Sequence, residues 1–272
     1  MRSFWFVTCA LTFALWSPTS AQTRSEANLV LTILGGAVTG HSLWTVDKQP
    51  LCVLDSNRQC TGQYDTLRLS RSMTSSVVLG AAGTFFPSPH VGFHAEISYV
   101  GFPLDSDCSA VAAFNADSAR VNEQICADIR AQSGGGGAIA FFGGVTLRAA
   151  TRGAFSPYVR GSIGLVNQAR STVEVVGGYV DAAGTVFERQ IIFDQKPRRT
   201  SMLLGAALGF TTPLGPGYQF RLEVRDMVTR FNRLTGPANG LGIGPTATQA
   251  YHHFALTLGF DVVLEKSRGR RY

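Results

Sequence analysis

Eight segments of this chain alternate large apolar side chains with small, polar or charged ones, and that period of two residues constrains the fold more than any other feature. In the stretch YQFRLEVRD, residues 218–226, the even positions are apolar as far as Val224, whereas the odd positions carry Gln219, Arg221, Glu223 and Arg225. This period is typical of β-strands with two different faces. The alternating segments lie near 29–38, 70–86, 90–102, 137–150, 157–169, 200–212, 217–230 and 250–264. They predict an all-β chain.

The composition of the two faces indicates which one points inward. Between 254 and 264 one face carries Phe, Leu and Val at every position, whereas the other holds Ala255, Thr257, Gly259, Asp261 and Val263. Glycine and alanine make a poor surface for a soluble barrel, but they suit the interior of a barrel of about eight strands, which has room only for side chains. We therefore predict that the large apolar face contacts lipid and that the charges point into a packed lumen.

The inward positions contain a nearly balanced set of charges. Buried charges need partners, so this balance predicts an ion-pair network that fills the lumen. A role of the same residues in lining or gating a pore is the alternative. The predicted lumen network consists of His94, Glu96, Arg148, Arg160, Arg221, Glu223, Arg225 and Asp261.

The connections between the segments alternate between short and long. The links at 87–90, 151–157 and 213–217 are short and rich in Gly, Pro and Ser, as tight turns require. Long polar links lie at 39–69, 103–136, 170–199 and 231–249. This pattern predicts a transmembrane antiparallel up-and-down β-barrel with short turns at one end and long loops at the other.

Two of the long links have structure of their own in this interpretation. The link 170–199 holds a strand-like pair that would make a barrel of ten strands, the alternative to eight. Glu188 and Arg189 fall on opposite faces of that pair, and a charge facing lipid near the bilayer centre costs roughly 2–4 kcal/mol for Arg. We therefore expect a hairpin above the membrane. Residues 117–130 predict a short helix within another link.

The N-terminus predicts export. Arg2 precedes an apolar run over residues 4–16, and Thr19 and Ala21 supply small side chains at the cleavage positions, as in a signal peptide cut after Ala21. The predicted division is a signal peptide at 1–21, a barrel at 22–264 and a short basic periplasmic tail at 265–272. The formal net charge of +6 comes with no arginine-rich helix or aromatic platform, so we expect no nucleic-acid partner.

Four cysteines remain after the signal peptide, in two close pairs in the first two long links. An even number of cysteines in an exported chain indicates disulfides. The preferred pairing is Cys52 with Cys60 and Cys108 with Cys126. Cross-pairing is the second choice and a metal site the third.

Over residues 28–264 the chain resembles the small bacterial outer-membrane β-barrels, of the OmpA/OmpX-type and porin-like families. The resemblance rests on the signal peptide, the eight alternating segments, the loop pattern and the last strand, HHFALTLGFDVVL. It implies a location in the bacterial outer membrane, with membrane lipid and the barrel-assembly machinery as partners. It also implies an assembly signal in the last strand, carried by Phe254, Leu256, Leu258, Phe260, Val262 and Leu264. The family pattern usually ends on a terminal Phe, whereas this chain continues through EKSRGRRY.

The resemblance leaves several functions open, because this fold hosts many activities. The preferred function is a structural or surface-interaction barrel that displays four extracellular loops, through which it could bind an extracellular ligand. The alternative is a narrow porin-like channel for small solutes. An outer-membrane lipid-modifying enzyme is a third interpretation, prompted by His252 and His253, but no spacing fixes a catalytic triad. We therefore expect no enzyme activity, no catalytic residue, no cofactor and no metal.

Overall fold

The computed structural model describes residues 28–111, 120–132, 135–149, 154–181, 183–197 and 199–264. The predicted signal peptide at 1–21, Cys9 within it and the basic tail at 265–272 lie outside the described residues.

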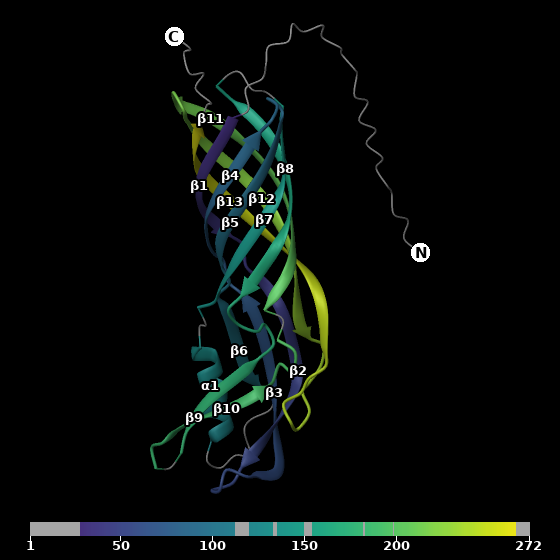
Figure 1. Ribbon diagram of the computed structural model, residues 1–272. Coiled ribbons are helices and arrows are strands. Elements are labelled where there is room, and N and C mark those ends of the chain that lie inside the picture. The colour runs from purple at the N-terminus through teal and green to yellow at the C-terminus, as the bar shows by residue number, and fades with distance from the viewer. Residues whose placement is uncertain are drawn as a thin grey trace, which may run out of the picture.

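Eight strands form a closed antiparallel barrel, which occupies the upper half of the molecule in Figure 1. In the order in which they neighbour one another, they are β1 (Asn28–Val38), β13 (Thr246–Leu264), β12 (Tyr218–Leu234), β11 (Thr200–Gly215), β8 (Ser156–Gln168), β7 (Gly137–Arg148), β5 (Val91–Gly101) and β4 (Ser76–Phe86). The first strand, β1, pairs with both β13 and β4 and so closes the barrel. The predicted fold class is confirmed, with eight strands rather than ten.

Small side chains on the inward face let the strands of this narrow barrel approach one another. Gly144 shows the constraint most clearly: a Cβ atom there would lie 2.0 Å from the carbonyl oxygen of Gly161 and 2.7 Å from Cε1 of His94. The glycine-rich face that the sequence places inside is therefore a requirement of the barrel's width.

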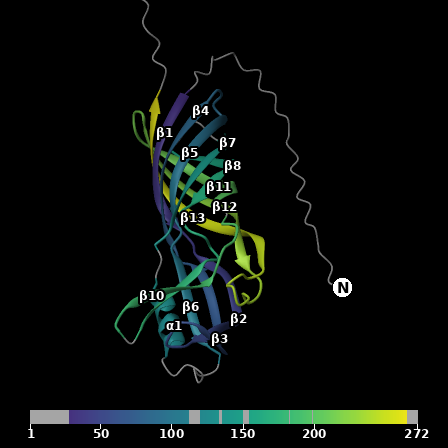
Figure 2. The ribbon, with the colours of Figure 1, turned by 60° about the horizontal axis from the view of Figure 1, so that its bottom comes forward.

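The long links fold into a compact extension, here called the head, at the end of the barrel opposite Asn28 (Figures 1 and 2). It contains a three-stranded sheet of β2 (His41–Leu54), β3 (Cys60–Met73) and β6 (Leu104–Ala110), the helix α1 (Val121–Ala131), and a hairpin of β9 (Val175–Val180) and β10 (Val186–Ile192). The hairpin stands outside the barrel, as expected. Among the described residues, no helix has the length and hydropathy required to cross a bilayer.

The strands β2, β3 and β6 correct the interpretation of residues 39–69 and 103–110 as polar loops. The register between β2 and β3 shifts three times, after Ser42, Val46 and Cys52, and each shift interrupts the period of two. Pro50 lies within β2, at the edge of the sheet, where a missing N–H is tolerated. The segment 70–86 also divides in two, because β3 ends at Met73 and β4 begins at Ser76.

The head and the half of the barrel next to it share one hydrophobic core. Inward side chains of the barrel, including Phe142, Leu203 and Met227, belong to the same buried cluster as Leu67 and Ile125 of the head. The head therefore packs onto the barrel mouth through apolar contacts, and it does not hang from flexible linkers.

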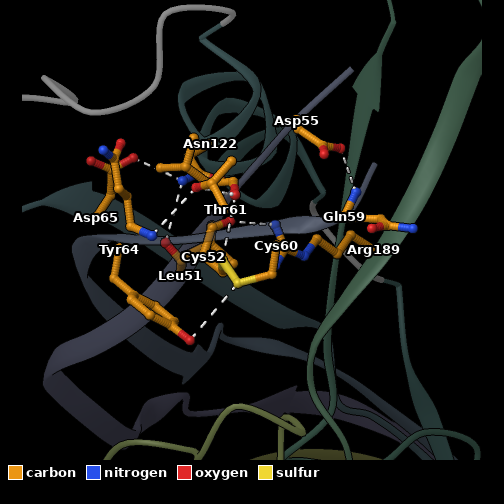
Figure 3. Close-up of a disulfide and its surroundings, with 12 residues drawn as sticks. Leu51, Cys52, Asp55, Gln59, Cys60, Thr61, Tyr64, Asp65, Asn122 and Arg189 are labelled. Atoms are coloured by element: carbon orange, nitrogen blue, oxygen red, sulfur yellow. Dashed lines mark hydrogen bonds between the residues drawn. A yellow bond between two sulfur atoms is a disulfide. The ribbon is translucent and has the colours of Figure 1, made fainter. Parts of the chain in front are cut away.

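Two disulfides join the predicted cysteine pairs. The first, Cys52–Cys60, links β2 to β3, and the structure around it is shown in Figure 3. Nη1 of Arg189, from β10, donates to the carbonyl of Cys52 at 2.8 Å, so this corner also holds the hairpin. The second, Cys108–Cys126, fastens α1 to β6, the strand that pairs with β3. It therefore constrains more than the single loop in which both cysteines lie.

Replacing both Cys108 and Cys126 by serine is expected to lower the stability of the head by about 3 kcal/mol, since the disulfide closes a loop of about 20 residues. Trp44, buried in the head, is the only tryptophan outside the first 27 residues, so its fluorescence reports on the head. Far-ultraviolet circular dichroism reports mainly on the barrel strands. A urea titration followed by both signals should show earlier loss of the Trp44 signal alone. The Cys52→Ser, Cys60→Ser pair is the control and should lose less, because its loop is shorter. Simultaneous loss of both signals in the Cys108→Ser, Cys126→Ser variant would contradict this expectation.

Candidate functional site

A network of buried ion pairs crosses the middle of the barrel. Nη1 of Arg225 lies 2.6 Å from Oε1 of Glu96, and Nε of Arg225 lies 2.9 Å from Oε1 of Glu223. Nη1 of Arg160 lies 3.4 Å from a carboxylate oxygen of each of the same two glutamates. The two carboxylates and two guanidinium groups come from β5, β8 and β12, so the network ties together strands on different sides of the barrel.

A second ion pair lies closer to the chain ends. Nη2 of Arg221 lies 2.8 Å from Oδ2 of Asp261, and Oγ1 of Thr32 donates to Oδ1 of the same carboxylate at 2.7 Å. Tyr158 donates its hydroxyl to Oε2 of Glu223 at 2.7 Å, between the two groups of charges. Thr32 and Tyr158 were not among the predicted network residues, although the alternation of their strands places both inside the barrel.

His94 and Arg148 are less integrated into the network. The Nδ1 atom of His94 lies 3.4 Å from Oγ1 of Thr146, and the guanidinium of Arg148 stacks 3.6 Å from the ring centre of Phe86. Neither forms an ion pair with another described residue. The structure thus brings together six of the eight predicted residues as ion-paired groups and places the other two beside them.

The lumen has almost no free space around this network. The cavity lined by Glu96, Arg160 and Glu223 measures about 10 Å³, which is about the volume that one water molecule requires. Ion pairs as tightly enclosed as these contribute mainly structure, because the cost of removing charges from water is offset only by well-formed partners.

Aromatic rings pack together at the end of the lumen next to the head. The ring centre of His253 lies 5.3 Å from that of Phe102 and 5.6 Å from that of Phe231. The ring of His41, at the start of β2, lies 4.7 Å from the ring of His253 and 4.8 Å from that of Tyr251. We call these five residues the mouth cluster. Their rings make continuous contact from the barrel interior to the head core.

The outward face of the barrel is apolar over most of its height. The predicted assembly-signal residues of β13 all lie on this face, and five of the six are exposed; Val262 is half-buried. Near the chain ends, exposed aromatic side chains gather on several strands: Phe85, Phe93, Tyr218 and Phe260. Aromatic side chains at the edge of an apolar band are typical of barrels embedded in a bilayer.

The two adjacent histidines of β13 point in opposite directions. Nδ1 of His252 lies 2.7 Å from Oδ2 of Asp226 on the outside, whereas Nε2 of His253 lies 3.1 Å from Oγ1 of Thr229 on the inside. They cannot act together at one site. Within the part of the chain that the structure describes, no group of three or more His, Cys, Asp or Glu side chains is arranged to hold a metal ion.

Comparison with known proteins finds only distantly similar structures. No family model and no curated protein sequence matches the chain. Similar solved structures include outer membrane protein OprG from Pseudomonas aeruginosa, with 13% identity, 89% of this chain and 98% of that chain covered and a TM-score of 0.45. Outer membrane protein AlkL has 10% identity, coverage of 94% and 99% and a TM-score of 0.43. Neisserial surface protein A has 11% identity, coverage of 87% and 97% and a TM-score of 0.37.

These similarities are too distant to assign an activity. The architecture instead follows from the chain's own strand pairing, closed lumen and apolar exterior. The chain is a closed antiparallel barrel of eight strands with an apolar outer face, and it carries a folded head at one end.

Proposed function

We propose that this protein is an integral outer-membrane barrel that anchors a rigid, disulfide-linked head at the cell exterior, where the head serves as a surface-interaction module without enzyme activity. The short turns and both described chain ends then face the periplasm, and the long links face outward, as is usual for such barrels. Outer-membrane lipid surrounds the apolar face, and the barrel-assembly machinery inserts the chain through its last strand.

The observation that carries this proposal is the continuity of the core from barrel to head. Apolar inward side chains of the outer half of the barrel pack against the head through the mouth cluster, and the charged half below leaves space for about one water. A solute that passed through the barrel would have to disrupt both the apolar packing at the mouth cluster and the ion-pair network below it. This arrangement therefore favours a closed barrel that carries a head, rather than a narrow porin-like channel.

Single-channel recording in planar bilayers tests this proposal. The refolded protein is expected to insert without steady conductance steps, because a filled lumen holds no continuous water column. A porin of known conductance, inserted in the same bilayers, shows that small currents would be detected. Protease protection of the barrel strands verifies that insertion has occurred. Reproducible conductance steps from the wild-type protein would overturn the closed-barrel proposal and favour the channel.

A further inference from the structure

We propose that a cleft in the head, lined by both polar and apolar side chains, binds a small anionic sugar, and so supplies a ligand class for the surface interaction proposed above. The cleft has a volume of about 580 Å³, within the range of small-molecule sites. It lies where the β3–β6 part of the sheet meets the C-terminal end of α1 and the links that flank the β9–β10 hairpin. These segments are distant in sequence and come from three different long links.

Arg71 of β3 provides a positively charged group in the wall of the cleft. Nε and Nη2 donate to Oγ of Ser106 at 3.1 and 3.0 Å, and Nη1 donates to the carbonyl of Glu174 at 2.5 Å. All of these acceptors are neutral, and Arg71 forms no ion pair with a described carboxylate. Its burial lowers the pKa to about 10, so the guanidinium is still charged at neutral pH. Arg71 is half-buried, its hydrogen-bond acceptors are neutral, and the carboxylate of Glu174 only partly offsets its desolvation, so an anion beside it is favoured.

Two further arginines, Arg170 and Arg199, line the same cleft and are exposed. Both carboxylates of the lining accept a hydrogen bond from a neutral side chain. Oδ2 of Asp194 accepts from Oγ of Ser171 at 2.5 Å, and Oε1 of Glu174 accepts from Nε2 of Gln190 at 2.8 Å. The three guanidinium groups therefore outnumber the two carboxylates, and neither carboxylate is ion-paired to them. This charge pattern selects a ligand with carboxylate or sulfate groups.

The rest of the lining indicates what carries that anion. Gln132 and Gln195 offer amide groups that can donate to and accept from hydroxyls, and Ser106, whose oxygen already accepts from Arg71, can still donate its hydroxyl. Phe193 also lines the cleft with about half of its side chain exposed, which provides an apolar ring face. A sugar ring has an apolar face and a rim of hydroxyls. An acidic sugar has an anionic group for the arginines, hydroxyls for the amide and hydroxyl groups, and an apolar face for the ring of Phe193.

The test is calorimetric titration of the protein without its predicted signal peptide, in detergent micelles, with a disaccharide that carries one uronate and one sulfate group. A neutral disaccharide of the same size is the comparison ligand. The test variant is Arg170→Gln with Arg199→Gln, because both side chains are exposed and their loss should leave the head folded. The matched control is Arg68→Gln, which removes a charge from β3 on the face opposite Arg71. Trp44 fluorescence shows that each variant is folded.

The wild type and Arg68→Gln are expected to bind the acidic disaccharide and not the neutral one, with an affinity that falls as salt is added. The double variant should bind at least about tenfold more weakly, the loss of roughly one favourable charge interaction for each arginine removed. The proposal is overturned if the wild type does not bind the acidic disaccharide, if it binds both ligands equally, or if the double variant and Arg68→Gln bind alike. This inference rests on the proposed outward position of the head. Its failure would leave a non-conducting barrel intact, whereas conductance would refute the closed barrel whether or not the cleft binds.

Discussion

Glu223→Ala is expected to lower the free energy of unfolding by about 3–5 kcal/mol, because it removes a carboxylate shared by two buried guanidinium groups. The side chain of Glu223 is 0% exposed and lies between Arg160 and Arg225, which are almost as deeply buried. It also accepts the hydroxyl of Tyr158. Its loss leaves these donors in a space that admits about one water. Urea unfolding in lipid vesicles, followed by circular dichroism, measures the effect.

Glu188→Ala is the matched control for this experiment. Glu188 is an exposed glutamate on β10, and the described residues offer it no ion pair, so the same substitution there should change stability by less than about 0.5 kcal/mol. If Glu223→Ala were as silent as Glu188→Ala, water would have to enter the lumen and solvate the arginines. That result would contradict the packed lumen described above.

Val224→Arg should destabilise the barrel by about 2–4 kcal/mol in a bilayer, since it places a charge in hydrocarbon near the middle of the apolar face. Val224 is the residue next to Glu223 in β12, but its side chain is 54% exposed on the outside of the barrel. Its cross-strand neighbours are Leu208 and Leu256, both on the same outward face. The free energy of unfolding is measured in lipid vesicles with a hydrocarbon core of normal thickness, because the new charge then lies in hydrocarbon.

Val186→Arg makes the same exchange in the head hairpin, where the valine is 70% exposed. It should have almost no effect on stability, because the new charge enters water. The two variants together separate a membrane barrel from a soluble one. Equal and small effects of Val224→Arg and Val186→Arg would mean that both valines face water, and the assignment of the outward face to lipid would be wrong.

The barrel could be predicted from the sequence because its strands obey a strict local rule. Over the membrane-facing part of β12 and β13, each inward residue is small, polar or charged and each outward residue is large and apolar. The identities of two neighbouring residues are therefore enough to tell which residues of the strand point inward. The same rule places Glu223, Arg225 and Asp261 in the lumen without any knowledge of their partners. Which carboxylate meets which arginine could not be predicted, because that depends on the relative height of strands far apart in the sequence.

The head could not be predicted, for the opposite reason. Its strands β2 and β3 pair through three register shifts, which remove the period of two on which the prediction relies. The sheet is completed by β6, which comes from another link after two barrel strands. The cleft around Arg71 depends on the same long-range association. In the sequence Arg71 is only one of several arginines in a polar stretch, and no local pattern distinguishes it.

The last two strands of the barrel have a mechanical consequence for the head. With 19 residues, β13 extends about 60 Å, roughly twice the hydrocarbon thickness of a bilayer, and it pairs along its length with β12. The two paired strands therefore continue without interruption from the membrane-facing part of the barrel to the base of the head. This continuous pairing restricts tilting of the head relative to the barrel. A partner that docks on it meets a surface of fixed tilt and height above the membrane, and little orientational freedom is left to be lost on docking.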